Sequence, residues 1–148
     1  MKAFLLAFDL GTSALKVVLY GLDGRILASE SRSYSHATPQ PGWAEADPSD
    51  WETALHQCLE ALSELPDLLN EVRVVAFTGQ MHTAVLLDAD KKPLSPTILW
   101  LDRRSTSETA ALQETLKLPP YQLNSTYTLP KLYWMAKHLP EVVAKAKH

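Results

Sequence analysis

The sequence of 148 residues has only one cysteine, Cys58, and no excess of basic side chains. A single cysteine cannot form an internal disulfide, and it gives no indication of a cysteine-ligated metal site. Fourteen basic against seventeen acidic side chains leave a formal net charge of −3. The protein therefore lacks the positive field that binds nucleic acid or an acidic membrane, which favours small molecules or other proteins as partners.

Long hydrophobic runs are missing as well. The apolar segment at residues 3–8 is too short for the hydrophobic region of a signal peptide, and it leads directly into Asp9. No segment approaches the ~20 apolar residues that are needed to span a bilayer. Internal repeats and low-complexity segments are also absent from the sequence. We therefore expect a cytoplasmic protein without a membrane segment.

What the sequence does contain is an ordinary globular composition, with 46% hydrophobic residues, sufficient for one sizeable core. Apolar patterning predicts strands over residues 3–9, 14–22, 25–34, 72–77, 83–87 and 97–101. The Asp-Gly pair at residues 23–24 is typical of a tight hairpin turn. The first three strands are therefore predicted to be consecutive and antiparallel.

Helix signals separate the later strands. They predict helices over residues 48–65, 105–116 and 130–139, with a last helical stretch toward residue 148. Asp47 and Pro48 have the order of an N-cap and a first helical residue, and Ser105 and Glu108 have the spacing of a capping box. Strands followed by alternating helices and strands predict a mixed sheet with flanking helices, an α/β fold. This order differs from a Rossmann domain, in which strand and helix alternate from the start.

The turn between the first two predicted strands has the residues of a phosphate site. Gly11 allows backbone angles that turn successive N–H groups toward an anion, and Thr12 and Ser13 add hydroxyl donors. Asp9 can hold Mg²⁺, and Lys16 can reach a terminal phosphate. The turn matches neither GxxxxGK[ST] nor GxGxxG. The alternative is an ordinary β-turn in which Asp9 caps loop amides and Lys16 is a solvated surface lysine.

Five segments, in order along residues 3–141, carry a family resemblance. AFDLGTSALKVVLY is similar to the D-x-G-T-[ST] phosphate motif of the sugar-kinase, actin and heat-shock-chaperone ATPase superfamily. The other four are GWAEADPSDWETA, FTGQMHTAVLLD, PTILWLDRR and LPKLYWMAKHLPE. Together these segments resemble the FGGY family of carbohydrate kinases, and its xylulokinase branch in particular.

The resemblance implies that residues 1–148 form the N-terminal, sugar-binding lobe of a two-lobed kinase, with a ribonuclease-H-like fold that is incomplete. Such kinases transfer the γ-phosphate of ATP, with Mg²⁺, to a hydroxyl of a sugar, here expected to be a ketopentose such as D-xylulose. By the match, Asp9 is the metal-side carboxylate. Gly11, Thr12 and Ser13 form the phosphate loop, with Lys16 as a point charge beside it.

The same match places Gln80, Met81, His82, Asp102 and Arg104 toward the sugar. An imidazole can hydrogen-bond a sugar hydroxyl while a methionine packs on the carbon skeleton. Each residue also has a structural alternative. Gln80 can pin the loop backbone, His82 can bond to backbone groups, and Met81 can lie in the core. Asp102 and Arg104 can form a surface pair before a helix, and the tryptophans are expected to serve packing.

The general base and the adenosine-binding motifs of the family are expected beyond His148, so we expect the isolated chain to be inactive. The oligomeric state is left open by the sequence, although the resemblance allows a homodimer, since family members are often homodimers. Two positions depart from the xylulokinase branch, since Leu101 replaces a usual Asn and Thr83 a common Gly. The alternatives are a family kinase for ribulose or gluconate, or a non-catalytic half-lobe that acts as a binding module.

Overall fold

A computed structural model describes residues 3–148, which divide into two compact units. The first unit consists of the chain up to Ser35 together with Ser49–Gln80. The second unit consists of His36–Pro48 together with Met81–His148. Among the described residues, no helix has both the length and the apolar character needed to cross a membrane.

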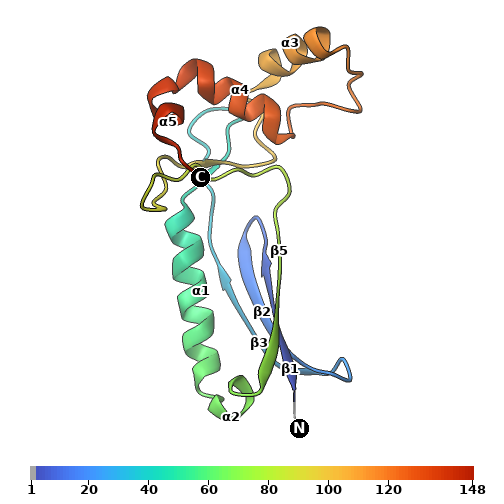
Figure 1. Cartoon of the computed structure of the whole chain (residues 1–148), viewed down its shortest axis with the longest axis vertical. Helices are drawn as coiled ribbons and strands as arrows, with labels where there is room; N and C mark the ends of the chain where they lie inside the picture. Colours follow the sequence, from blue (N-terminus) through green and yellow to red (C-terminus); the bar gives the residue numbers. More distant parts are fainter. Residues whose placement is uncertain (1–2) are drawn as a thin grey trace. The chain divides into compact units, whose positions relative to one another are not determined.

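The first unit is built on a four-stranded sheet with the strand order β3-β2-β1-β5 (Figure 1). Its strands are β1 (Phe4–Leu10), β2 (Ala14–Gly21), β3 (Ile26–Ser33) and β5 (Val72–Gly79). β1, β2 and β3 pair antiparallel, whereas β5 lies parallel to β1. The predicted mixed sheet and its three consecutive antiparallel strands are therefore confirmed.

The predicted hairpin turn between β2 and β3 is also confirmed. Gly24 has a φ of +81°, which favours glycine because it has no Cβ to clash with the backbone. The Asp23 carboxylate accepts a hydrogen bond from the Arg25 N–H at 3.1 Å, and the Gly21 N–H donates to the Arg25 carbonyl at 2.9 Å. The turn is short and internally bonded, so it fixes the register of the two strands.

Helix α1 (Pro48–Ser63) packs on one face of this sheet (Figure 1). The core between them contains Leu6, Phe8, Leu15, Val17 and Leu19 from the strands and Ala54, Cys58 and Leu62 from the helix. The strand residues follow the two-residue period of a sheet and the helix residues the four-residue spacing of one helix face. The predicted helix is confirmed, and Pro66 opens a further short helix, α2 (Pro66–Leu69), that the sequence pattern did not predict.

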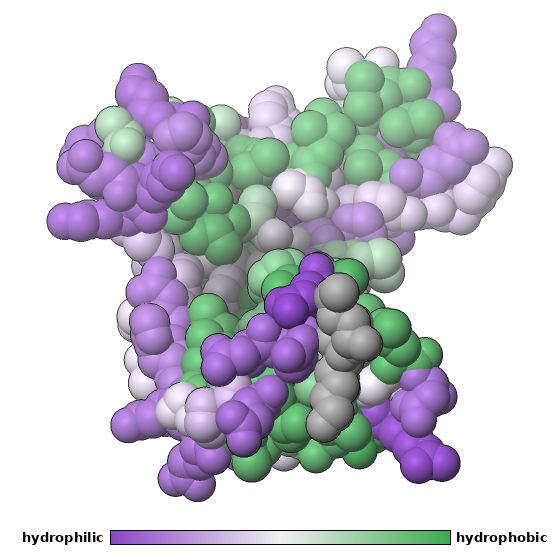
Figure 2. Space-filling view, turned by 60° about the horizontal axis from the view of Figure 1, so that its bottom comes forward, coloured by the Kyte–Doolittle hydropathy of each residue, from purple (hydrophilic) through white to green (hydrophobic). Residues whose placement is uncertain are grey.

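The edge strand β5 is largely uncovered. Val74, Val75 and Phe77 are 50%, 51% and 77% exposed, although β1 on its other side is mostly buried or half-buried. Figure 2 shows hydrophobic side chains at the surface of this unit, near the end where the chain begins. An exposed apolar edge strand is a site at which another strand can pair.

The second unit combines a small sheet with three helices. β4 (Glu45–Ala46) pairs antiparallel with β6 (Thr97–Ile98). The helices are α3 (Thr106–Leu116), α4 (Thr128–His138) and α5 (Pro140–Lys145). All three helices were predicted, although α4 begins two residues before Pro130.

Three local predictions in the second unit are wrong. Residues 83–87 do not form a strand, because only Leu87 finds a bridge partner, Pro93, and a strand needs partners along its length. The strand predicted over 97–101 ends at Ile98, since the chain turns and the Asp102 N–H donates to the Leu99 carbonyl. The capping box is absent as well. Ser105 makes no side-chain cap bond, and the Glu108 carboxylate accepts instead from the Lys137 ammonium and the Ser107 hydroxyl.

Candidate phosphate and sugar sites

The turn between β1 and β2 is tight at Gly11, its first position. The Gly11 N–H donates to the Ala14 carbonyl at 2.9 Å, which brings the two residues into close contact. A Cβ added to Gly11 would lie 3.0 Å from the same carbonyl oxygen. A side chain at Gly11 would therefore require this backbone oxygen to move by a few tenths of an ångström. The Gly11 N–H is bonded within the turn, so the expectation that it points toward an anion is wrong.

The carbonyl of Gly11 is held by two side chains, one directly after β3 and the other directly after β5. It accepts a hydrogen bond from the Tyr34 hydroxyl at 2.7 Å and a second one from the Gln80 amide at 3.0 Å. The Tyr34 N–H also donates to the Ser13 carbonyl at 3.0 Å, and the Thr12 hydroxyl lies 3.5 Å from the Gln80 amide oxygen. Gln80 thus contacts the loop backbone, which was the alternative to a sugar contact.

Tyr34 is a residue that the sequence analysis missed. Burial, and then the nearby charge of Asp9, raise the pKa of Tyr34 to about 12, so its hydroxyl stays a proton donor at neutral pH. The register of the predicted hairpin could have identified Tyr34. Ser33 at the end of β3 pairs with Ala14 at the start of β2, so the next residue, Tyr34, lies beside the turn. An aromatic residue there can reach the loop backbone, whereas the preceding serine cannot.

Asp9 and Lys16 lie directly opposite each other on β1 and β2, and both are exposed. Their neighbours Phe8 and Val17 face the α1 core, so by strand alternation Asp9 and Lys16 belong to the other face of the sheet. Among the described residues, no group of three or more His, Cys, Asp or Glu side chains could enclose a metal ion. Asp9 instead offers a single carboxylate, which suits Mg²⁺, because that ion keeps several waters and uses few protein ligands.

Apart from Gln80, which ends the first unit, the residues predicted for the sugar lie in the second unit. Met81 is 76% exposed, so its alternative role as a core residue is wrong. His82 has a φ of 57°, an uncommon conformation for a residue with a Cβ. Its ring lies 4.4 Å, centroid to centroid, from the ring of Tyr127, at an interplanar angle of 37°. An exposed thioether therefore lies next in sequence to an imidazole whose ring packs against an aromatic side chain.

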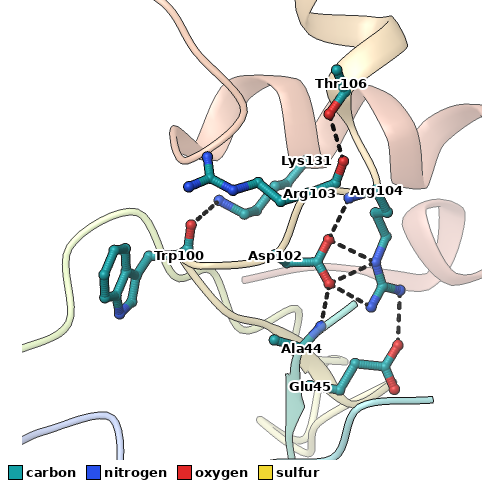
Figure 3. Close-up of polar contacts among 8 residues, drawn as sticks. All are labelled: Ala44, Glu45, Trp100, Asp102, Arg103, Arg104, Thr106 and Lys131. Carbon is teal, nitrogen blue, oxygen red and sulfur yellow. Dashed lines mark hydrogen bonds and ion pairs between the residues drawn. The ribbon is translucent and has the colours of Figure 1, made fainter. Parts of the chain in front are cut away.

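Asp102 and Arg104 form a buried ion pair rather than the surface pair that was the alternative (Figure 3). Their side chains are 0% and 3% exposed. The Asp102 carboxylate accepts from the Arg104 side chain through both oxygens, from Nε at 3.0 Å to each and from Nη2 at 2.8 Å, and from the Ala44 N–H at 2.6 Å. Arg104 also pairs with Glu45 at 2.8 Å. These contacts join the loop that follows β6 to Ala44 and Glu45 at the start of β4.

The Arg104 guanidinium also lies over aromatic rings. Its central carbon is 3.7 Å from the ring centroid of Trp43 and 5.1 Å from that of Trp134. The two indole rings meet edge to face at 5.5 Å. Cation–π contacts of this kind stabilise a desolvated guanidinium by about 2 kcal/mol. The packing role expected for the tryptophans is therefore confirmed for Trp43 and Trp134.

Comparison with known proteins identifies relatives over nearly the whole chain. The pattern of the FGGY family of carbohydrate kinases, N-terminal domain, matches residues 4–148. The xylulose kinase of Bacillus subtilis (strain 168) is 34% identical over 151 residues, covering 96% of this chain and 30% of the relative. A glycerol kinase of Methylibium petroleiphilum is 31% identical, covering 97% of this chain and 30% of the relative. The chain thus spans about 30% of the length of the curated relatives that it matches.

Solved structures agree with this assignment. A xyloylose kinase from Brucella ovis matches with a TM-score of 0.90 and 32% identity, covering 97% of this chain and 31% of that one. A gluconate kinase from Lactobacillus acidophilus matches with a TM-score of 0.85 at 24% identity, covering 99% of this chain and 30% of that one. The second match supports the fold alone. The predicted α/β fold, a mixed sheet with helices like that of the sugar-kinase N-terminal lobes, is therefore confirmed.

Proposed function

Because the chain belongs to the FGGY family of carbohydrate kinases, we propose that it supplies the phosphate loop and part of the sugar site of an ATP-dependent sugar kinase. The acceptor that we propose is a hydroxyl of a ketopentose, D-xylulose in the first place. Several relatives with 30–35% identity bear the name xylulose kinase, which supports this choice over ribulose or gluconate.

The observation that carries the proposal is the braced turn at the end of β1. Gly11 lies so close to Ala14 that an added Cβ would be 3.0 Å from the Ala14 carbonyl oxygen, and the Gly11 carbonyl accepts hydrogen bonds from both Tyr34 and Gln80. A turn held in this way from two neighbouring strands is pre-organised, so little conformational entropy is lost when a phosphate binds. Phosphoryl transfer depends mainly on such positioning and on neutralisation of charge.

Two charged groups beside this turn support the proposal, because Asp9 and Lys16 lie opposite each other on β1 and β2. Asp9 would hold Mg²⁺, directly or through water, and Lys16 on the paired strand would approach a phosphate as a point charge. Held there, the ion would supply neutralisation of phosphate charge. The Tyr34 hydroxyl, protonated at neutral pH, donates to the Gly11 carbonyl, so this carbonyl is satisfied within the protein.

In the second unit, we assign the sugar contact to Met81 and His82. The exposed Met81 thioether can cover the apolar edge of a sugar, and the His82 imidazole can exchange a hydrogen bond with a hydroxyl. Asp102 and Arg104 have their polar atoms engaged by protein groups, so we assign them to holding the loop that follows β6. Gln80 is likewise assigned to the phosphate loop.

The experiment needs a two-lobed protein, because the chain covers about 30% of its relatives. Residues 1–148 are extended either by the rest of their own reading frame or by the corresponding remainder of the Bacillus subtilis relative, and we call this the extended protein. In it, Asp9→Asn should lower kcat by about 10²–10³-fold at saturating ATP and Mg²⁺, since one preorganised charge contact is lost. Sugar-dependent ADP release is measured in a coupled assay.

The matched control is Asp23→Asn in the β2–β3 turn of the same unit. The Asp23 side chain is 61% exposed, and an Asn-Gly pair suits the hairpin turn as well as Asp-Gly does. This variant should keep the parent turnover. Near-normal turnover of the Asp9→Asn variant would remove Asp9 from the mechanism.

A further inference from the structure

Lys131 occupies a position that two physical rules disfavour. The residue is 3% exposed, although lysine is almost never fully buried without a partner. It also stands in the first turn of α4, where the positive end of the helix dipole opposes a cation. A lysine kept at such a position needs compensating contacts, and these contacts indicate what it does.

The compensation comes from three backbone carbonyls. The Lys131 ammonium donates to the carbonyl of Thr126 at 2.5 Å and to those of Trp100 and Tyr127 at 3.4 Å each. Figure 3 shows the contact with Trp100. An ammonium has three N–H donors, so the three carbonyls use all of them. Burial lowers the pKa of Lys131 to about 8, against the opposite influence of the Asp102 charge, so the group is still largely charged at pH 7.

The three carbonyls belong to two separate segments of the second unit. Trp100 lies between β6 and the buried Asp102–Arg104 pair, whereas Thr126 and Tyr127 form the turn that leads into α4. The Tyr127 ring lies 4.4 Å from that of His82. The Lys131 ammonium therefore holds the backbone of Tyr127, and the Tyr127 side chain packs against His82, the residue that we propose to contact the sugar.

We propose that Lys131 is a positioning residue of the sugar site, which fixes Trp100 and Tyr127 so that the Tyr127 ring orients the His82 imidazole. The proposal rests on the proposed function of His82. The φ of 57° at His82 supports it, because a residue in this conformation persists only when its surroundings hold it there. The Tyr127 ring is such a surrounding group, and Lys131 sets its place.

The first experiment needs no activity and uses the 148-residue chain. Histidine ring resonances are recorded by NMR for the parent and for Lys131→Met, and the His82 signals are assigned with a His82→Gln variant. Tyr127→Leu gives the His82 shifts in the absence of the aromatic ring. We expect Lys131→Met to move the His82 resonances toward those of Tyr127→Leu, while His56 on α1 stays unchanged. Unchanged His82 resonances in a folded Lys131→Met protein overturn the proposal.

A second variant, Lys131→Arg, tests the proposal in case Lys131→Met does not fold. Lys131→Arg keeps the charge, but a planar guanidinium cannot donate to three carbonyls that converge on one point. If Lys131→Met loses its near-ultraviolet circular dichroism, the same displacement of His82 is expected in Lys131→Arg. A folded Arg variant with parent His82 resonances overturns the proposal. Lys145→Met, on the exposed surface of α5, is the control and should change nothing.

The second experiment separates sugar binding from ATP binding in the extended protein. Lys131→Met should raise the KM for D-xylulose by about tenfold or more, with the KM for ATP changed less than about twofold, because only the sugar side is misplaced. Equal increases in both KM values overturn the positioning role. If the parent extended protein shows no sugar-dependent ADP release, the proposed function fails by itself, and the NMR shift still decides whether Lys131 positions His82.

Discussion

Removal of the Asp102 carboxylate tests whether the buried pair is structural, as its geometry indicates. In Asp102→Ala, the Arg104 guanidinium loses its bonds to both carboxylate oxygens, and the Ala44 N–H loses its acceptor. Arg104 stays buried, because its side chain is only 3% exposed. The variant therefore leaves a buried charge with fewer partners, which is the costly way to break an ion pair.

The expected loss of stability follows from that burial. Removing one partner of a buried ion pair typically costs about 3–5 kcal/mol. Arg104 keeps its bond to Glu45 at 2.8 Å and its place over the Trp43 ring, so we expect the lower end, about 3 kcal/mol. For a domain of this size, about 2–4 °C of Tm is lost per kcal/mol, which corresponds to about 6–12 °C.

The assay is urea unfolding of the 148-residue chain, followed by tryptophan fluorescence and circular dichroism. The control is Arg25→Ala, which removes an exposed pair whose side chains are 83% and 61% exposed and should cost less than about 1 kcal/mol. The double variant Asp102→Ala/Arg104→Met should be less destabilised than the sum of the two single variants, because it leaves no unpaired buried charge. A loss in Asp102→Ala as small as that in Arg25→Ala would refute the reasoning.

Three further predictions concern other parts of the molecule. Burial by itself would raise the pKa of Glu108, but hydrogen bonds from Lys137, from the Glu108 backbone and from Ser107 lower it from 4.5 to about 2. The charged Glu108 therefore stabilises the fold above about pH 4.5, and this stabilisation is lost as the pH falls toward 2. The urea midpoint of Glu108→Gln should thus decline less over that pH range than the midpoint of the parent protein. In the extended protein, His82→Ala should raise the KM for the sugar far more than that for ATP, since an unpaired polar group costs about 1–3 kcal/mol; equal effects return His82 to a structural role. The 148-residue chain should self-associate through its open sheet edge at about 100 µM in sedimentation velocity, and Phe77→Lys should reduce this; a parent protein that stays monomeric contradicts the expectation.

The elements with strong local signals were predictable from the sequence. The antiparallel strands, the Asp-Gly turn and helix α1 follow from short-range periodicity and from turn residues, which act within a few positions of the chain. The segment at residues 83–87 shows the opposite case, because its apolar pattern resembles a strand but finds a bridge partner only at Leu87. Pairing is a property of the whole fold, and local patterning does not contain it.

The candidate site shows the same division. Gly11 was singled out from its motif and from the backbone freedom of glycine, which are local features of the sequence, whereas the Tyr34 bond to its carbonyl joins positions 23 residues apart. The burial of Asp102 depends on Ala44, 58 residues away in the sequence. A residue's role in a site can thus be proposed from its motif, but whether its side chain is exposed to a ligand or satisfied by the protein is decided by long-range packing.

The central claim is that residues 1–148 supply the phosphate loop and part of the sugar site of a sugar kinase. The most direct measurement is ADP release by the extended protein and by the 148-residue chain, with ATP and Mg²⁺ and a panel of D-xylulose, ribulose, gluconate and glycerol. We predict that a ketopentose stimulates ADP release by the extended protein and that no sugar does so for the 148-residue chain alone. Absence of stimulation by every sugar in the extended protein, or a comparable rate from the 148-residue chain, would contradict the account.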